Sequence, residues 1–179
     1  LVEAAMIGAN IPANIKREHF AFQDWPDYDE ALWKLIRSSQ LKRAQDCYGR
    51  IIGYDLNPHT VALAKLNIAN SGLEDYIEIH CENFFETKKP EGPTHLVFNP
   101  PYGVRILGDI PVMYKSIGDT LKKNYSGAEA WFLTSHMDGL KHVGLRASRK
   151  IEIYQAKLEC RFVKYEMYQG SKKMKYKQV

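Results

Sequence analysis

The chain has 179 residues, of which 45% are apolar and 12% aromatic, and these values favour one globular domain over residues 1–179. It contains no run of about 18 uncharged apolar residues and does not begin with a basic-then-apolar leader, which argues against a membrane protein. Three scattered cysteines favour reduced thiols in the cytoplasm, and six scattered histidines without ligand spacing argue against a metal site. The formal net charge is only +4.

Two helices are predicted in the first 45 residues. Residues 1–11, LVEAAMIGANI, are helix-forming with helical apolar spacing, and Pro12 ends this run. The second helix is predicted over residues 30–45, because helical spacing places Leu32, Leu35 and Ile36 on one face. Acids at its start and bases at its end complement the helix dipole.

Residues 50–72 predict a strand followed by a helix. The strand covers residues 50–54, and Asp55 closes it. Asn57 is suited to cap the helix, and Pro58 to its first position, where the missing N–H is not needed. The helix is expected to end near Gly72.

The rest of the chain alternates between strands and a helix. Strands are predicted over residues 76–84, 94–99 and 129–135, a helix over 112–125, and an antiparallel hairpin over 149–155 and 158–168. This order implies an α/β fold whose mainly parallel sheet is wound with helices and carries an antiparallel C-terminal edge. No internal repeat or linker marks a domain boundary.

The predicted order lacks a strand at its beginning. A βαβ chain is expected to open with a strand, yet residue 1 is already helical. A parallel sheet without its central strand would leave ladder hydrogen bonds unpaired on both sides. We therefore expect the sequence to begin downstream of the first strand.

Polar residues follow three of the predicted strands: Asp55, the pair Glu82 and Asn83, and Asn99. Ligands of open α/β sheets bind outside the carboxyl ends of the strands. Asp55 is placed to accept both hydroxyls of a ribose, although an acid at this point is equally typical of a helix cap. Glu82 and Asn83 could bind an adenine ring.

The third strand end reads Asn99-Pro100-Pro101-Tyr102. Two prolines remove two backbone donors and fix φ, so the carbonyls of Asn99 and Pro100 are held without a competing N–H. An amide and an aromatic ring beside them suit a planar amino group that is hydrogen-bonded while its ring stacks on Tyr102. The alternative is a turn that only leads the chain out of the sheet.

These motifs resemble a known family. NPPYG after HLVF, with GYDLNPHTVALAKLN upstream, is similar to the amino-methylating class I S-adenosylmethionine methyltransferases, which have a Rossmann-like fold. More narrowly, LVEAAMIGANIPANI, NPPYGVR and IEIYQAKLECRF resemble the THUMP-associated enzymes that methylate guanine N2 of large-subunit (23S) ribosomal RNA. The resemblance covers roughly residues 1–168.

The sequence departs from the family in three places. The first strand and the Asp-Pro-x-Cys-Gly-Ser-Gly-Thr loop that wraps the cofactor are missing here, as is the upstream THUMP domain, so we expect a longer parent protein that contains them. Glu82 replaces the more common Asp, and Gln155-Ala156 stands where Asn-Gly is usual at the hairpin.

The resemblance implies roles for the strand-end residues. Asn99 and Pro100 would accept the two N–H bonds of the target amine, and Tyr102 would stack on its base. The implied cofactor contacts are Asp55, Leu56, Glu82, Asn83 and Asn99, and family position implies that Glu3 also faces the cofactor. The implied substrate contacts are Pro101, Tyr102, Gly103 and Arg105, the last toward a phosphate. A solvated loop arginine and a helical surface glutamate are the alternatives for Arg105 and Glu3.

Four functions remain open from the sequence. Methylation of ribosomal RNA is the first, N6-adenine methylation of DNA the second, and methylation of a protein glutamine amide the third. The fourth is a non-enzymatic nucleic-acid-binding domain without a cofactor loop.

Charge is unevenly distributed along the chain. Residues 141–179 carry a net charge of +8 against −4 for residues 1–140, and the stretch Lys141–Lys150 between predicted strands favours nucleic acid. A solvated lysine-rich tail explains the last nine residues as well.

Overall fold

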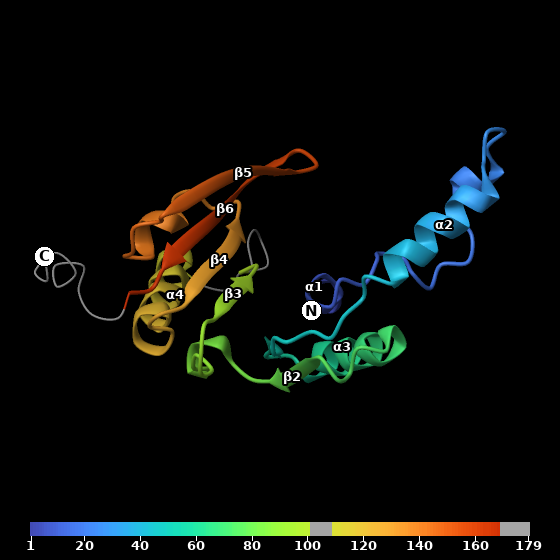
Figure 1. Cartoon of the computed structure of the whole chain (residues 1–179). Helices are drawn as coiled ribbons and strands as arrows, with labels where there is room; N and C mark the ends of the chain where they lie inside the picture. Colours follow the sequence, from blue (N-terminus) through green and yellow to red (C-terminus); the bar gives the residue numbers. More distant parts are fainter. Residues whose placement is uncertain (101–108, 169–179) are drawn as a thin grey trace, which may run out of the picture. The chain divides into compact units, whose positions relative to one another are not determined.

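The computed structural model describes residues 1–100 and 109–168. The chain divides into two compact units, Leu1–Phe84 and Phe85–Val179. The helices are α1 (Val2–Gly8), α2 (Glu30–Leu41), α3 (Pro58–Ser71) and α4 (Ile110–Asn124), and the strands are β1 (Ile51–Asp55), β2 (Ile77–Cys81), β3 (His95–Phe98), β4 (Glu129–Thr134), β5 (Arg149–Gln155) and β6 (Leu158–Glu166) (Figure 1). Within the described ranges, no helix is both long and apolar enough to cross a membrane.

The first unit contains a small parallel sheet with α3 against it. β1 and β2 pair in parallel, with Ile51 opposite Ile77 and Asp55 opposite Cys81. The predicted caps of α3 are confirmed: Asn57 accepts a hydrogen bond from the backbone N–H of His59 at 2.9 Å, and Gly72 ends the helix at a φ of 70°. Asn57 thereby satisfies a backbone donor that the first turn cannot pair.

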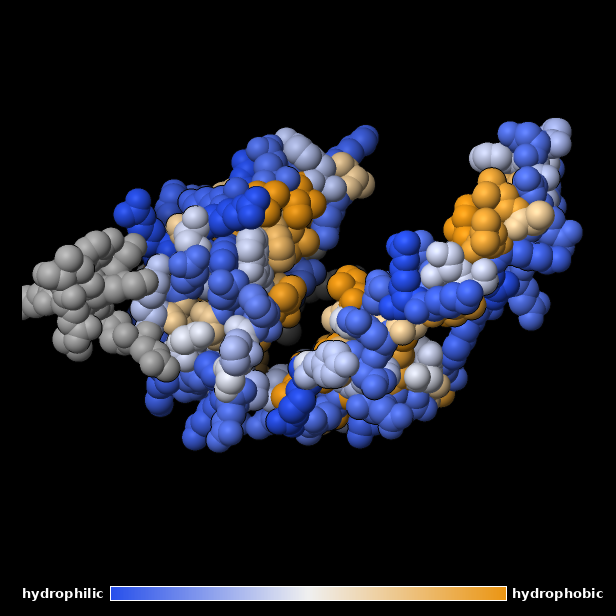
Figure 2. Space-filling view, viewed as in Figure 1, coloured by the Kyte–Doolittle hydropathy of each residue, from blue (hydrophilic) through white to orange (hydrophobic). Residues whose placement is uncertain are grey.

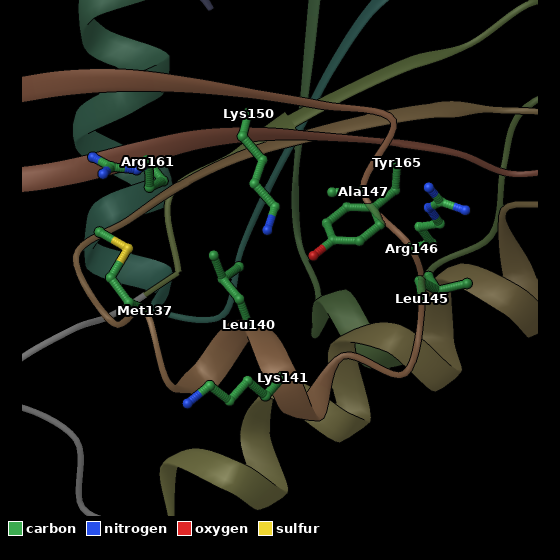
Figure 3. Close-up of a pocket in the computed structure, with 9 residues that line it drawn as sticks. All are labelled: Met137, Leu140, Lys141, Leu145, Arg146, Ala147, Lys150, Arg161 and Tyr165. Carbon is green, nitrogen blue, oxygen red and sulfur yellow. The ribbon is translucent and has the colours of Figure 1, made fainter.

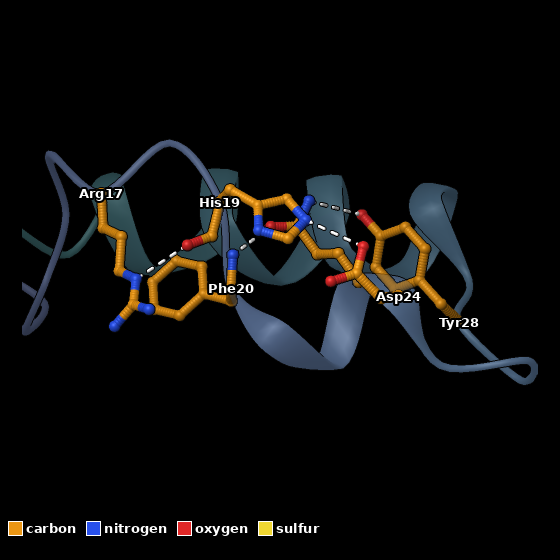
Figure 4. A network of polar contacts seen from close by, with 6 residues as sticks. Arg17, His19, Phe20, Asp24 and Tyr28 are labelled. Carbon is orange, nitrogen blue, oxygen red and sulfur yellow. Dashed lines mark hydrogen bonds and ion pairs between the residues drawn. The ribbon is translucent and has the colours of Figure 1, made fainter.

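A polar network and an aromatic cluster organise the segment before α2. The backbone carbonyl of His19 accepts a hydrogen bond from Arg17 Nε at 2.7 Å. The imidazole Nε2 of His19 lies 3.1 Å from Oδ1 of Asp24 (Figure 4). The ring of Trp33 on α2 packs edge-on against Phe20 and Phe22. These contacts tie the single-turn helix η1 (Ala21–Asp24), which the sequence did not predict, to α2.

The second unit contains a four-stranded sheet in the order β3-β4-β6-β5. β3 and β4 are parallel, whereas β6 runs antiparallel to both β4 and β5. The predicted C-terminal hairpin is therefore confirmed. Among the described strands, β1 pairs only with β2 and β3 only with β4, so two separate sheets are observed where the sequence predicted one.

Alternation along β4 and β6 separates the two faces of this sheet. Phe132, on β4, is fully buried, its ring lies over that of Tyr165 at 5.5 Å, and its edge contacts Tyr114 of α4. The Tyr114 hydroxyl and the Thr134 hydroxyl share a buried hydrogen bond. α4 thus covers the face that carries Phe132.

A close backbone approach holds the segment after β4 against α4. A Cβ built on Gly118 would lie 1.7 Å from the carbonyl oxygen of Val143, so only glycine permits this contact. Val143 follows the short helix η3 (Gly139–His142) and is 1% exposed. Gly118 therefore fixes where η3 lies along the sheet.

Candidate functional site

The predicted cofactor-contacting residues lie at the carboxyl ends of β1 and β2. Asp55 is the last residue of β1, and Glu82 and Asn83 follow β2. The backbone N–H of Glu82 donates to the carbonyl of Asp55 at 3.0 Å, which extends the ladder by one residue. The parallel pairing therefore brings these strand ends together, as the sequence predicted.

The Asp55 carboxylate divides its two oxygens between different surroundings. Oδ1 accepts from the backbone N–H of Asn57 at 2.8 Å and so closes the turn between β1 and α3. Within the described part of the chain, no hydrogen bond reaches Oδ2. Asp55 can therefore serve the turn before α3 and still contact a ribose, because the turn occupies one oxygen and leaves the other for a ligand hydroxyl. Leu56, next in the chain, is 70% exposed.

An aromatic pair lies beside these acids. The rings of Tyr54 and His80, on neighbouring strands, are stacked with their centroids 5.6 Å apart. Burial raises the pKa of Tyr54, and the charge of Glu82 raises it further. The carboxylate of Glu82 therefore acts on the Tyr54 phenol, and this edge combines negative charge with a flat ring surface.

The predicted amine-binding residues belong to the second unit. Asn99 and Pro100 directly follow β3, and Asn99 is exposed whereas Pro100 is buried. A buried proline anchors the backbone at the point where the amide of Asn99 reaches the surface. Pro101, Tyr102, Gly103 and Arg105 lie outside the described residues, so their predicted roles stay predictions.

The remaining predicted residues lie elsewhere in the two units. Glu3 is exposed in the first turn of α1. Lys141 belongs to η3 and Lys150 to β5. Asp55 and Glu82 therefore lie on neighbouring strand ends of the first unit, and Asn99 and Pro100 belong to the second.

A cavity of about 420 Å³ in the second unit was not predicted from the sequence (Figure 3). The residues that line it come from the segment after β4, from η3, and from β5 and β6: Met137, Leu140, Lys141, Leu145, Arg146, Ala147, Lys150, Arg161 and Tyr165. The alternation of β6 was a usable signal, since it places Arg161 and Tyr165 on one face. The basic stretch Lys141–Lys150 was recognised, but not its enclosure of a cavity.

The chain matches a family of known sequences along most of its length. A model described as the RMKL-like methyltransferase domain matches residues 1–164. The Ribosomal RNA large subunit methyltransferase K/L of Shewanella frigidimarina is 30% identical over 177 residues, which cover 96% of this chain. The chain spans only 25% of that relative's length.

Solved structures share the fold. The crystal structure of SMU.472, a candidate methyltransferase complexed with SAH, superposes with a TM-score of 0.85 at 30% identity and covers 95% of this chain and 45% of that one. A protein from Listeria monocytogenes, named as a predicted N6-adenine-specific DNA methylase, gives a TM-score of 0.78 at 25% identity over 95% of this chain and 43% of that one. The α/β architecture is thus that of Rossmann-like class I methyltransferases.

Proposed function

We propose, from the premise that this chain belongs to the RMKL-like methyltransferase domain family, that it takes part in S-adenosylmethionine-dependent methylation of an exocyclic amino group in large-subunit ribosomal RNA. The observation that carries the proposal is the family match over residues 1–164, within which Asn99 and Pro100 follow a parallel strand. The relative from Shewanella frigidimarina, whose name states this substrate, supports ribosomal RNA. A cytoplasmic location, guanine N2 as the target, and a THUMP domain in a longer parent protein belong to the same proposal.

The first unit would hold the cofactor. Oδ2 of the half-buried Asp55 accepts no hydrogen bond from a described residue and suits the ribose hydroxyls. Glu82 and Asn83 directly follow the carboxyl end of the neighbouring strand β2. S-adenosylmethionine supplies an electrophilic methyl group when it is bound. The residues of this chain therefore need only orient the two reactants.

The second unit would hold the target amine. An exocyclic amine conjugated with its ring is flat and weakly nucleophilic. The amide oxygen of Asn99 and the carbonyl of Pro100 would accept its two N–H bonds, so that the nitrogen can pyramidalise and its lone pair is no longer conjugated with the ring. The methylated nitrogen would then lose a proton. The same two oxygens would stabilise the positive charge that develops on the nitrogen.

A substitution of Asn99 tests this role. In the complete parent protein, we expect Asn99→Ala to abolish tritium transfer from labelled S-adenosylmethionine to deproteinised ribosomal RNA, because one amine acceptor is lost. Calorimetry should show cofactor affinity within a few-fold of the unsubstituted parent protein. Asn70→Ala, at an exposed position of α3, is the matched control. Undiminished transfer by Asn99→Ala would exclude the proposed role.

A second candidate function is N6-adenine methylation of DNA, which the Listeria monocytogenes structure favours by its name. Asn99 and Pro100 would accept an adenine amino group equally well. Parallel assays on ribosomal RNA, duplex DNA and a glutamine-containing protein separate the candidates, since only one acceptor should become labelled efficiently.

A further inference from the structure

The cavity beside η3 has the size and walls of a ligand site. Its volume of about 420 Å³ lies within the range of small-molecule pockets. η3 forms one wall and strands β5 and β6 form the opposite wall, and Gly118 holds η3 in place through its contact with Val143 (Figure 3). All of these elements belong to the second unit.

Four basic side chains line the cavity, and two of them are already paired. Lys141 lies 2.6 Å from Asp138, and Arg161 lies 2.7 Å from Glu159 and 3.6 Å from Glu152. Arg146 and Lys150, in contrast, form no ion pair with any residue in the described ranges. Among the described residues that line the cavity none is acidic, so two positive charges remain for an anionic ligand.

The hydroxyl of a largely buried tyrosine opens onto the same space. Tyr165 is only 2% exposed, and its ring is stacked on Phe132. In Figure 3 its hydroxyl and the ammonium of Lys150 both point into the cavity above Leu140. Within residues 1–100 and 109–168, no hydrogen bond reaches this hydroxyl.

The protonation state of Tyr165 makes it a donor. Burial is the main cause that raises the pKa of Tyr165 to about 12, so the phenol stays protonated at neutral pH. The side chain of Tyr165 lines the cavity, so its hydroxyl can donate to a ligand there. A ligand that carries a strong acceptor, such as a phosphate oxygen, would suit this donor.

The other walls are apolar and provide room for more than an anion. Met137, Leu140, Leu145 and Ala147 contribute them. The cavity also reaches the sheet edge of the proposed amine site, because Arg161 lies opposite Thr134 at the carboxyl end of β4, and β4 runs parallel to β3. A nucleotide combines a phosphate with a less polar sugar and base, and therefore matches this lining.

We propose that this cavity binds a nucleotide of the RNA strand that carries the target base, with its phosphate between the Lys150 ammonium and the Tyr165 hydroxyl. The inference rests on the proposed function for the identity of the polyanion as RNA, and it adds a contact away from the reacting amine.

Salt-dependent binding tests the role of Lys150. The probe is a fluorescein-labelled single-stranded RNA of twelve nucleotides, and its affinity is measured by anisotropy over a series of KCl concentrations. Loss of one phosphate contact lowers the slope of log K against log salt by about 0.7, so we expect this change for Lys150→Gln. Lys157→Gln, in the exposed turn between β5 and β6, is the matched control and should keep the wild-type slope.

Tyr165→Phe separates ligand binding from a structural role. We expect RNA affinity to fall about tenfold, because a hydrogen bond to a charged group is lost. Without RNA, the melting temperature should stay the same or rise, since the removed hydroxyl has no described partner. A large loss of stability in Tyr165→Phe would show that the hydroxyl is structural and would overturn its part in the proposal.

The remaining outcomes distinguish this inference from the proposed function. Wild-type RNA affinity and salt slope in Lys150→Gln would overturn the inference, whatever the methylation assay shows. If AMP binding depends on Lys150 but RNA binding does not, the cavity takes free nucleotides and the inference also fails. If RNA binding depends on Lys150 and Tyr165 but RNA is not methylated, the cavity assignment stands and the proposed function fails.

Discussion

The two compact units bury their apolar side chains to different extents. In the second unit, Phe132 and Tyr114 are fully buried between the four-stranded sheet and α4. The buried cluster of the first unit consists of smaller side chains: Ala5, Ile68, Leu73 and Ile77. On α2, Leu32 and Leu35 are 52% and 65% exposed, and apolar side chains appear on the surface of this segment in Figure 2.

Sheet size accounts for this difference. A two-stranded sheet has little surface to cover, whereas three or more strands with an apolar face can support a core. The hairpin of β5 and β6 gives the second unit that face, since β6 pairs with β4 over six residues from Glu129 to Thr134. We therefore expect the second unit to be the more stable one.

Three tryptophans allow the units to be followed separately. Trp25 and Trp33 report on the first unit and Trp131 on the second. A Trp131→Phe variant reports on the first unit, and a Trp25→Phe, Trp33→Phe double variant on the second. If both variants show one coincident denaturation curve, the expected difference between the units does not exist.

The largest expected effect is that of Phe132→Ala. Phe132 is 0% exposed and contacts both Tyr165 and Tyr114, so its truncation should lower the free energy of unfolding by about 3–5 kcal/mol. Urea denaturation followed by Trp131 measures this change. The transition reported by Trp25 and Trp33 should shift less, and an equal shift would contradict the separation of the two cores.

A smaller effect is expected for Ile68→Ala in the first unit. Ile68 is 5% exposed and packs in a cluster of short side chains, so we expect a loss of about 2 kcal/mol, at the low end for such truncations. Fluorescence of Trp25 and Trp33 during urea denaturation measures it. Ile68→Val keeps most of the volume and should lose clearly less; a loss equal to that of the alanine variant would point to strain rather than lost packing.

The secondary structure was largely predictable because its signals are local. The cap at Asn57, the end of α3 at Gly72 and the hairpin of β5 and β6 each depend on a few neighbouring residues, and each prediction is confirmed. The positions of Asp55 and Glu82 at strand ends were also predictable, because a parallel sheet aligns the carboxyl ends of its strands.

The cavity beside η3 could not be predicted because it depends on contacts between distant residues. Its position follows from the approach of Val143 to Gly118, and nothing in the sequence near Gly118 shows that another backbone passes there. The place of Lys150 in the lining of the cavity and the burial of Tyr165 likewise depend on the tertiary arrangement. Single-turn helices such as η1 and η3 were missed because three or four residues carry no periodic pattern.

Alkaline pH should weaken the second unit. The pKa of Tyr165 rises from 10.0 to about 12 on folding, so folding favours the protonated phenol. Its contribution is complete below pH 10 and is lost as the pH rises toward 12, with a loss on the order of 1 kcal/mol by pH 11. Urea midpoints followed by Trp131 at pH 8 and pH 11 measure the loss, and Tyr165→Phe should remove that part of the pH dependence. An unchanged difference in the phenylalanine variant would assign the effect to other groups.

The smallest expected effect is a gain at the turn of the hairpin. Ala156 has a φ of 54°, in the left-handed region, where a Cβ is unfavourable by roughly 1–2 kcal/mol. Glycine relieves this cost but makes the unfolded chain more flexible, so we expect Ala156→Gly to stabilise the second unit by about 0.5–1 kcal/mol. Gln155 pairs with Leu158 across the hairpin of β5 and β6, so the turn at Ala156 forms despite this cost. The Trp131 transition measures the gain, with Ala147→Gly as a control outside the turn; a loss of stability in Ala156→Gly would show that hairpin pairing already offsets the strain.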